Sequence, residues 1–491
     1  MLYEVRSPRL RVRDHKTKIV ATIGPASESP GMIERLIRSG LDIARLNFSH
    51  GAFEKHGEII DRIRQAARNV GRNVAIMADL PGPKMRIGKV DPEPICLKEG
   101  EDFSLTTSEV LGNSRQVSIS FEPLPRVVKP DDRIFLNDGL VQLRVLRADQ
   151  SHVYCKVVVG GELRSRKGLN LPGIKLGISA FTEHDRACLE FALQHGVDAI
   201  SQSFVEGPDD VEIVRAAALK MGKRPLIMAK IERAAALGNY EKILEAADGI
   251  MIARGDLGIE VPIQEIAVLQ KELIMKACVA GKPVITATQM LESMVSSPLP
   301  TRAESTDVAN AILDGTDCVM LSGESAMGRY PEEAVTMLGK IAAATEPHRP
   351  PPWLQYMLDQ TQKPSNAGQA MAVLVERALE TTPSAAIFVP TSSGRTARMI
   401  SRFKPAIWTV AVTSDENAAR ALQFSYGVVP VHLAEEPEDW RQFASLWVQE
   451  QLTSGNVALL VAGASSRQPD ANYRIEFLPV SERRMSAATS S

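Results

Sequence analysis

Short apolar runs recur through the first three quarters of the chain, and most of them end in polar residues. Eight runs have this form: KTKIVATIG (16–24), LDIARLNFS (41–49), NVAIMADL (73–80), VDAISQSF (197–204), RPLIMAKIE (224–232), ADGIMIARGD (247–256), KPVITATQM (282–290) and DCVMLSGE (317–324). Segments with helical spacing lie between most of them, such as GMIERLIRSG (31–40) and QEIAVLQKELIMKACVAG (264–281). This alternation is typical of βα units, and eight units predict a closed (β/α)8 TIM barrel. A doubly wound open sheet is the alternative that the pattern leaves open.

The series of βα units is interrupted once, between the third and fourth runs. Residues 88–169 alternate in short β-rich segments, and Asn137-Asp138-Gly139 joins two of them through residues that tolerate positive φ. The pattern predicts an all-β insertion, mounted as a lid on the face of the barrel that carries active sites.

A proline-rich stretch follows the last expected barrel helix, with Pro347, Pro350, Pro351 and Pro352 close together. Because proline ends helices, we expect a linker there. Beyond it, the strand-like runs SAAIFVP (384–390), IWTVAVT (407–413), NVALLVAG (456–463) and YRIEFLPV (473–480) alternate with helical segments. The chain is therefore predicted to contain a barrel domain (1–87 and 170–346), an all-β lid (88–169) and a C-terminal α/β domain (347–491).

Composition narrows the function classes. The 491 residues include 57 Lys and Arg against 59 Asp and Glu, and this near balance argues against a chain-wide nucleic-acid or membrane-surface footprint. No window approaches the roughly 18 apolar residues of a membrane span. The five cysteines, Cys96, Cys155, Cys188, Cys278 and Cys318, occur singly without metal-ligand spacing. We expect reduced thiols and a cytoplasmic protein.

Three charged residues end two adjacent expected strands and suggest metal chemistry. Lys230 and Glu232 end the fifth run and Asp256 ends the sixth, so a barrel brings them to one rim. Two carboxylates with few other ligands suit Mg²⁺ or Mn²⁺, which takes the rest of its shell from water and substrate oxygens. The alternative is a simple salt bridge at the rim.

Other polar strand ends face the same rim and suggest phosphoryl transfer. No Walker loop, GxGxxG or HExxH motif occurs, so phosphate must be held in another way. Arg45, Lys230 and Arg86 would place three cations around one point, which neutralises a transferring phosphoryl group. The remaining polar residues expected at this rim are Asn47, Ser49, Asp79 and Thr288.

Several long motifs resemble those of the pyruvate kinase family. They are TKIVATIGPAS (17–27), ARLNFSHG (44–51), KGLNLPG (167–173), MAKIE (228–232), ARGDLG (253–258), ATQMLESM (287–294) and LSGESAMGRYPEEAV (321–335), and the resemblance extends from about Thr17 to Val480. It implies transfer of a phosphoryl group from phosphoenolpyruvate to ADP, giving pyruvate and ATP in the last step of glycolysis. It also implies a homotetramer.

The resemblance assigns roles residue by residue. Glu232 and Asp256 match divalent-metal ligands, Lys230 matches the lysine that stabilises the transferring phosphoryl group, and Arg45 matches a phosphate-binding arginine. The remaining implied roles are substrate carboxylate binding by Gly255, Asp256 and Thr288, enolate protonation at Thr288 through a water relay with Ser322 and Glu324, and nucleotide binding by Asn47, His50, Arg86 and Lys167. Alternatively, His50 caps a turn and Ser322 simply hydrogen-bonds Glu324.

The potassium site of the family departs from its usual pattern here. Asn47, Ser49 and Asp79 match its ligands, but Leu80 replaces a Thr and Lys84 replaces a Glu. Leucine supplies no side-chain oxygen, and the Lys84 ammonium puts a fixed positive charge in or beside the site. We therefore expect no potassium requirement; the alternative is that Lys84 points to solvent and potassium binds.

A loop in the C-terminal domain resembles the effector-phosphate loop of the family. Thr391, Ser392, Ser393, Gly394, Arg395 and Thr396 follow an expected strand and precede a helix, so their hydroxyls and N–H groups suit a phosphate. An ordinary Ser/Thr helix cap is the alternative. After VAGASSRQPDAN the chain lacks the tryptophan and glycine-rich loop of members that respond to fructose bisphosphate, so we expect a sugar or nucleoside monophosphate as the effector.

Two rival functions remain at this point. A metal-dependent carbon–carbon lyase acting on phosphoenolpyruvate or pyruvate would have no nucleotide site. A degenerate metabolite sensor would be expected to lose Lys230, Glu232 or Asp256, and the sequence retains all three.

Overall fold

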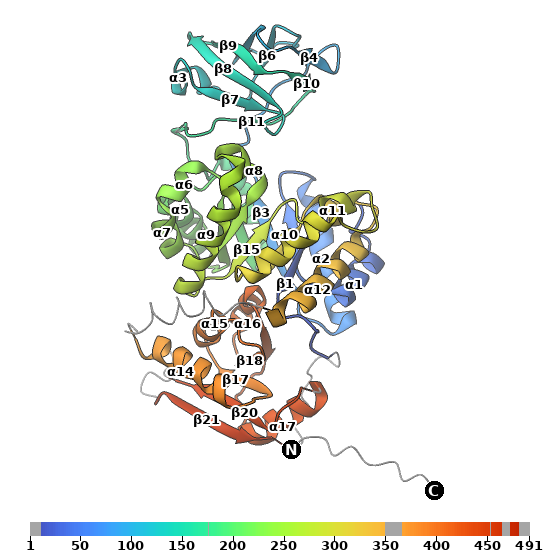
Figure 1. Cartoon of the computed structure of the whole chain (residues 1–491), viewed down its shortest axis with the longest axis vertical. Coiled ribbons are helices and arrows are strands. Elements are labelled where there is room, and N and C mark those ends of the chain that lie inside the picture. Colours follow the sequence, from blue (N-terminus) through green and yellow to red (C-terminus); the bar gives the residue numbers. More distant parts are fainter. Residues whose placement is uncertain (1–10, 175, 349–365, 452, 464–471, 481–491) are drawn as a thin grey trace.

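A closed barrel of eight parallel strands forms the centre of the molecule (Figure 1). The computed structural model describes residues 11–174, 176–348, 366–451, 453–463 and 472–480. The barrel order is β1-β16-β15-β14-β13-β12-β3-β2. Its strands are β1 (Lys18–Thr22), β2 (Leu41–Asn47), β3 (Ala75–Leu80), β12 (Ala199–Gln202), β13 (Leu226–Ile231), β14 (Gly249–Ala253), β15 (Val284–Ala287) and β16 (Cys318–Leu321). Each lies within one of the eight predicted runs, so the closed barrel is confirmed and the open sheet is excluded.

Helices surround the barrel and return the chain between its strands. Their ends follow local sequence signals: Ser29 caps α1, and Thr182 and Asp185 form a capping box at α4. The helices are α1 (Pro30–Ser39), α2 (Phe53–Val70), α4 (Glu183–Gln194), α5 (Pro208–Lys220), α6 (Ala234–Gly238), α7 (Tyr240–Ala246), α8 (Arg254–Glu260), α9 (Ile266–Ala280), α10 (Arg302–Leu313), α11 (Gly323–Ala326) and α12 (Pro331–Thr345), with 3₁₀ turns η1 (Ile263–Glu265), η2 (Glu292–Val295) and η3 (Glu346–His348).

The predicted insertion is a β domain at one end of the molecule (Figure 1). It contains a six-stranded sheet, β11-β7-β8-β9-β5-β6, and a β10-β4 pair. The expected hairpin is present, since β7 and β8 pair antiparallel and Asn137, Asp138 and Gly139 all have positive φ. The strands are β4 (Ile95–Leu97), β5 (Asp102–Thr106), β6 (Gln116–Ser118), β7 (Arg133–Leu136), β8 (Val141–Ala148), β9 (His152–Val159), β10 (Gly161–Leu163) and β11 (Leu169–Asn170), and one short helix, α3 (Leu124–Val127), accompanies them.

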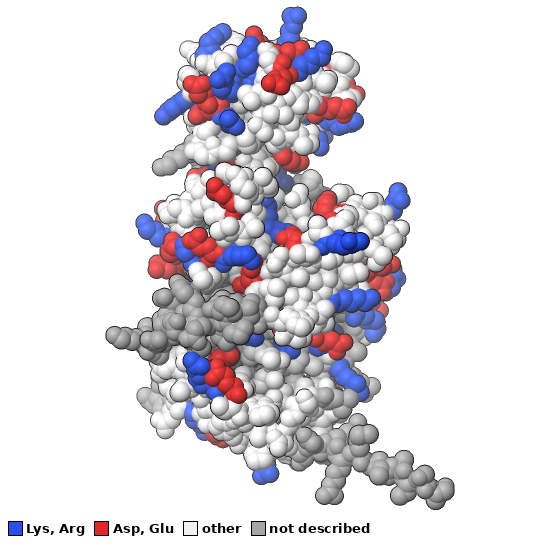
Figure 2. Space-filling view, viewed as in Figure 1, with Lys and Arg blue, Asp and Glu red and all other residues white. Residues whose placement is uncertain are grey.

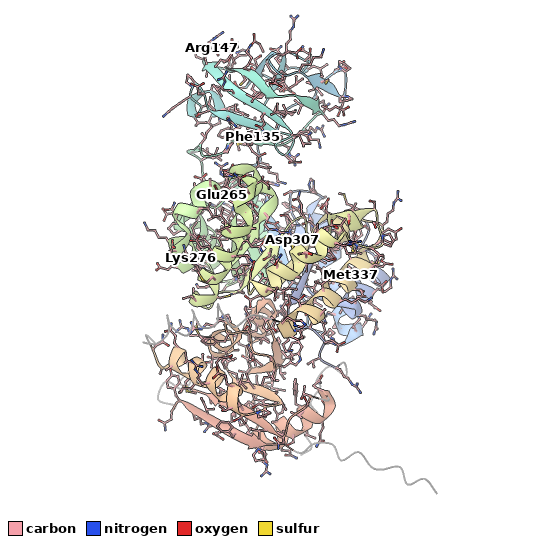
Figure 3. The ribbon with its side chains drawn as sticks, viewed as in Figure 1. Phe135, Arg147, Glu265, Lys276, Asp307 and Met337 are labelled. Atoms are coloured by element: carbon pink, nitrogen blue, oxygen red, sulfur yellow. The ribbon has the colours of Figure 1, made fainter. Side chains whose placement is uncertain are left out.

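The lid stands over the barrel and has a mixed surface. Phe135 of β7 lies on the side of the lid that faces the barrel, and Arg147 of β8 lies at the far end (Figure 3). Basic and acidic side chains are interspersed on the visible face of the lid (Figure 2). This face of the lid therefore carries no patch of a single charge sign.

The C-terminal domain packs against the opposite end of the barrel (Figure 1). Its sheet has the order β19-β18-β17-β20-β21. The elements are α14 (Ala367–Thr381), β17 (Ala386–Pro390), α15 (Arg395–Ser401), β18 (Trp408–Thr413), α16 (Glu416–Ala421), η4 (Leu422–Phe424), β19 (Val428–His432), α17 (Trp440–Gln451), β20 (Val457–Ala462) and β21 (Arg474–Pro479). Of the predicted linker prolines, Pro347 lies in η3, and Pro350, Pro351 and Pro352 lie outside the described residues.

The interior of the barrel is in contact with the C-terminal domain at its lower end. Its fully buried strand residues, including Val20, Met77 and Met228, pack in one cluster with Phe424 from η4, so the C-terminal domain closes the lower end of the barrel. Polar contacts reinforce the junction: Lys18 Nζ donates to the Val428 carbonyl at 2.8 Å, and Lys404 pairs with Asp317 at 2.6 Å. The upper end, toward the lid, is thereby left as the accessible face.

In the part of the chain that the structure describes, no helix combines the length and apolar character needed to cross a membrane.

Candidate active site

Lys230 lies at the centre of the upper rim of the barrel, at the end of β13. Its Nζ donates to the Ser203 hydroxyl at 2.7 Å and lies 3.2 Å from Glu232 Oε2 and 3.4 Å from Asp79 Oδ1. The two carboxylates are almost fully buried, at 2% exposure each. The structure therefore brings together the lysine and two of the carboxylates that the sequence placed at this rim, Asp79 and Glu232.

Mutual electrostatic effects set the charge states of this cluster. Burial alone would lower the pKa of Lys230, but Asp79 and Glu232 outweigh it and raise that pKa above its ordinary value. Burial would raise the pKa of Asp79, but Lys230 and Arg45 hold it below its ordinary value. Lys230 is therefore charged at neutral pH, as a role beside a phosphoryl group requires.

Glu232 is the residue of this cluster whose ionisation depends most on a neighbouring positive charge. Burial raises its pKa to about 7, helped by Asp256 and opposed by Lys230. Its Oε1 accepts from the Phe204 N–H at 2.8 Å, whereas Oε2 is buried without a hydrogen bond and is ion-paired with the Lys230 ammonium 3.2 Å away. A buried carboxylate oxygen that is stabilised by a cation alone, with a second carboxylate nearby, is a suitable environment for a divalent cation.

Asp256 completes the carboxylate pair from the neighbouring element. It lies exposed in the first turn of α8, directly after β14. Among the described residues, no group of three or more His, Cys, Asp or Glu is arranged to hold a metal. The donor set thus fits a hard cation that takes most of its ligands from water and substrate, and fits poorly with a closed structural metal site.

Arg45 reaches the same rim from β2 and is held in a fixed orientation. Its Nε donates to Asp79 Oδ2 at 2.9 Å and its Nη1 to the Thr22 hydroxyl at 2.8 Å. Asn47 and Asp79 face each other in the β2–β3 register, which explains why side chains from both strand ends meet here. Buried arginine with fixed donors suits recognition of a phosphate or carboxylate.

The turns after β14 and β15 are locked to each other. The Gly255 N–H donates to Thr288 Oγ1 at 2.7 Å, and Thr288 adopts a positive φ of 69°. Arg254 supports this turn by donating to the Thr288 carbonyl at 2.8 Å and to Asp307 of α10 at 2.7 Å. The strained backbone of Thr288 is therefore held by two consecutive residues of α8, one of which is held in turn by α10.

The two residues expected to relay a proton, Ser322 and Glu324, are close to each other in the sequence. Their hydrogen bonds are made to groups other than Thr288. Glu324 is fully buried and accepts from the backbone N–H groups of Ser322 at 2.7 Å and Leu291 at 3.1 Å. The Thr288 hydroxyl donates to the Ala287 carbonyl instead. The Ser322–Glu324 contact is thus made by backbone, which leaves the serine hydroxyl out of that bond.

The expected nucleotide residues surround the junction of barrel and lid. Arg86 donates to the Arg166 carbonyl at 2.8 Å, and the Ile87 N–H donates to the Lys167 carbonyl at 3.0 Å, so the two arms of the lid run side by side. His50 is exposed, and burial together with Lys84, Arg86 and Arg45 lowers its pKa. Because the charges of Lys84, Arg86 and Arg45 contribute to this lowering, His50 lies beside a group of cations.

Two of the residues expected at the potassium site, Asn47 and Leu80, are the last residues of β2 and β3. Asn47 Oδ1 accepts from the Ser49 N–H at 3.1 Å, and Leu80 is fully buried. Lys84 is an exposed residue, yet desolvation of its ammonium lowers its pKa to about 8. The positive charges of Arg86 and Lys230 add to this lowering, whereas the negative charges of Asp79 and Asp256 oppose it. The Lys84 charge therefore acts on the carboxylates of the rim.

The expected effector loop joins β17 to α15. Gly394 caps α15 with a φ of 76°, its N–H donates to the Thr391 hydroxyl at 2.9 Å, and Arg398 donates to the Ser393 carbonyl at 3.0 Å. Gly394, at the N-cap position of α15, has no side chain to cap the helix, and the Thr391 hydroxyl accepts from the N–H of this residue just before the first helical turn.

Two residues of the site were not singled out from the sequence. Ser203 accepts from Lys230 and donates to the Leu80 carbonyl at 2.7 Å, and Thr22 accepts from Arg45. Both follow or end expected strands, in VDAISQSF and KTKIVATIG, so the rule that located Lys230 applied to them as well.

Comparisons with known proteins agree with this arrangement. The family model "Pyruvate kinase, barrel domain" matches residues 14–335, and "Pyruvate kinase, alpha/beta domain" matches residues 369–473. A pyruvate kinase of Thermococcus litoralis is 47% identical over 87% of this chain and 90% of its own length. One from Geobacillus stearothermophilus is 45% identical over 84% of this chain and 71% of its own length.

A solved structure extends the match to the whole fold. It is a crystal structure of a pyruvate kinase from Cryptosporidium parvum, with a TM-score of 0.89 and 36% identity, covering 98% of this chain and 100% of the other. Together with the family models and the curated relatives, it shows that the chain belongs to the pyruvate kinase family, an enzyme family of phosphotransferases.

Proposed function

We propose that the chain transfers the phosphoryl group of phosphoenolpyruvate to ADP, giving pyruvate and ATP as the last step of glycolysis. The observation that carries the proposal is the charged Lys230, enclosed by Asp79, Glu232 and Ser203 at the accessible rim of a barrel whose other end is closed. Phosphoryl transfer depends on fixed charges beside the moving group, which such a cluster supplies.

The rim residues divide the work of binding and charge stabilisation. Glu232 and Asp256 would hold Mg²⁺ or Mn²⁺, which supplies positive charge to the phosphate and carboxylate oxygens of the substrate. Lys230 places a second positive charge beside the transferring phosphoryl group. Arg45, held by Asp79 and Thr22, binds the phosphate from the adjacent strand.

The locked turn after β14 suits the substrate carboxylate. The backbone at Gly255 and Asp256, with Thr288, would bind it, because N–H groups at the start of α8 favour an anion. Protonation of the enolate then takes place on the Thr288 side. Since a hydroxyl is too weak an acid alone, Ser322 and Glu324 would relay the proton through water.

The nucleotide side of the site would lie between the barrel and the lid. Asn47, His50, Arg86 and Lys167 would bind ADP between the barrel and residues 88–169, and closure of this domain would exclude water from the reacting phosphoryl group. In this proposal the barrel (1–87 and 170–346) carries the phosphoenolpyruvate site, the lid closes over it, and the C-terminal domain (347–491) regulates the enzyme.

A coupled assay tests the reaction. Purified protein with phosphoenolpyruvate, ADP and MgCl₂ should cause NADH oxidation through lactate dehydrogenase, and omission of any one should abolish it. Consumption of phosphoenolpyruvate that does not require ADP would contradict the proposal and favour lyase chemistry.

Potassium is not expected to be required. Replacing potassium by tetramethylammonium at constant ionic strength should change kcat by less than about threefold, under roughly 1 kcal/mol, because the Lys84 ammonium already acts on Asp79. Lys84→Glu should lower activity, with partial rescue by potassium since Leu80 supplies no oxygen. Lys89→Glu, at another exposed lysine, is the control. An enzyme almost inactive without potassium would contradict this expectation.

The C-terminal domain would regulate a cytoplasmic homotetramer through a phosphorylated metabolite at residues 391–396. A sugar or nucleoside monophosphate should lower the half-saturating phosphoenolpyruvate concentration by about fivefold, more than fructose bisphosphate does. Arg395→Gln should abolish this response, and Arg377→Gln, at an exposed arginine of α14, should preserve it. A panel of such metabolites that leaves the half-saturating concentration unchanged would contradict the assignment.

A further inference from the structure

Arg233 is a buried cation directly after the proposed metal ligand Glu232. The residue is 3% exposed, although arginine is rarely buried without carboxylate partners. It follows β13 and caps the short helix α6. A side chain of this kind holds neighbouring segments in a fixed relation, because separating them would leave a buried charge unpaired.

Two carboxylates neutralise Arg233. Its Nη1 donates to Glu260 Oε1 at 2.7 Å and its Nε to Glu206 Oε1 at 3.2 Å. The second oxygen of Glu260 accepts from the Ala234 N–H at 3.3 Å. Glu260 therefore binds both the side chain and the backbone of the turn that follows Glu232.

Arg233 also holds the return arm of the lid. Its Nη2 donates to the Ile174 carbonyl at 2.9 Å, and its Nη1 donates to the Leu171 carbonyl at 3.5 Å. These residues lie directly after and a few positions after β11, the last strand of the lid. The arm that also carries Lys167 is thus attached to Arg233 by two of its carbonyl groups.

The pair connects this arm to both proposed metal ligands. Glu232 precedes Arg233 in the chain, and Glu260 is the last residue of α8, whose first turn carries Asp256. The outgoing arm of the lid is attached elsewhere, because the Gly82 N–H donates to Asp185 of α4 at 2.9 Å. Among the described residues of the two arms, only those of the return arm accept hydrogen bonds from Arg233, which is ion-paired to Glu260.

We propose that Arg233 is a positioning residue that couples the return arm of the lid to the spacing of Glu232 and Asp256. Through it, divalent-cation binding at the rim and the placement of the lid's nucleotide-binding arm are set together. The inference rests on the proposed function for the identity of the nucleotide, but the coupling itself does not need turnover to be observed.

Arg233→Gln tests the coupling, because glutamine keeps one donor but removes the charge and the fork. In hydrogen exchange of the wild-type protein, Mn²⁺ should slow the amides of residues 166–174, and in the variant this protection should fall by about tenfold. Under turnover, KM for ADP should rise about tenfold, while KM for phosphoenolpyruvate should rise less than about threefold. Arg233→Lys, which keeps the positive charge, should lose less of the Mn²⁺ protection and raise KM for ADP less than Arg233→Gln does.

Matched variants separate coupling from general loss of stability. Arg215→Gln removes an arginine that similarly pairs with a carboxylate, Asp248, and a carbonyl, Ala246, beside the start of β14 at the other end of the barrel. It should leave both readouts unchanged. Should Arg233→Gln fail to fold, Glu206→Gln removes only the negative charge 3.2 Å from Arg233 Nε, on a side chain that is 29% exposed, and should show the same effects in weaker form.

The outcomes are distinct. Unchanged Mn²⁺ protection of residues 166–174 in Arg233→Gln overturns the proposal, and so does an equal rise of both KM values. If the wild-type protein showed no phosphoryl transfer but its Mn²⁺ protection depended on Arg233, the proposed function would fail while the coupling would stand.

Discussion

Lys230→Met is expected to lower kcat by at least about a hundredfold, or roughly 3 kcal/mol of activation free energy. Methionine keeps the length and apolar stem of the side chain but removes the charge beside the transferring phosphoryl group. The half-saturating phosphoenolpyruvate concentration should change less than kcat, because Arg45 still binds the phosphate. Steady-state kinetics at saturating MgCl₂ measure both quantities.

The variant should still fold. Arg45 continues to hold Asp79, and Glu232, whose pKa is already raised to about 7, takes up a proton when the lysine is lost. Circular dichroism and thermal unfolding check this point. Lys276→Met on α9, which removes a lysine paired with Glu241 and Glu272 on the outer surface, is the control and should retain full activity. Near wild-type kcat in Lys230→Met would remove the central role of this residue.

Asp256→Ala is expected to have the second large effect. It should lower kcat by at least about a hundredfold and weaken Mn²⁺ binding to the free enzyme by at least about tenfold, because Glu232 then remains as a single carboxylate. The side chain is exposed, so the free energy of unfolding should hardly change. Titration calorimetry with Mn²⁺ gives a readout that is independent of turnover.

Asp61→Ala on the exposed face of α2 controls for the loss of one negative charge and should bind Mn²⁺ as the wild type does. If Asp256→Ala bound Mn²⁺ with unchanged affinity, the carboxylate pair would not be the metal site. A return of activity at high MgCl₂ would, by contrast, agree with a ligand role.

Much of the fold follows from one local pattern. Apolar strand centres with polar ends predict a barrel because the interior accepts only the former and the carboxyl-terminal rim exposes the latter. The same pattern located Lys230, Asp79 and Arg45, whose strands β13, β3 and β2 end at that rim. The Asn137–Gly139 hairpin was predicted for a similarly local reason, since positive φ is a property of the turn itself.

Partners of the site residues on other segments could not be predicted in this way. Ser203, the hydrogen-bond acceptor of Lys230, directly follows the neighbouring strand β12, and its selection among several polar strand ends depends on barrel register. The Arg233–Glu260 pair depends on where the return arm of the lid meets α8. Such contacts join segments that are far apart in the sequence. They can be identified only when the turn after β13, helix α8 and the return arm of the lid have been packed together.

Phosphorus NMR of the wild-type protein in a mixture of phosphoenolpyruvate, ADP and MgCl₂ tests the central claim most directly. The account predicts that the phosphoenolpyruvate resonance falls while the γ-phosphate resonance of ATP rises by an equal amount, and that Lys230→Met slows both changes together. Release of inorganic phosphate in place of ATP, or consumption of phosphoenolpyruvate with no change in the nucleotide resonances, would contradict it.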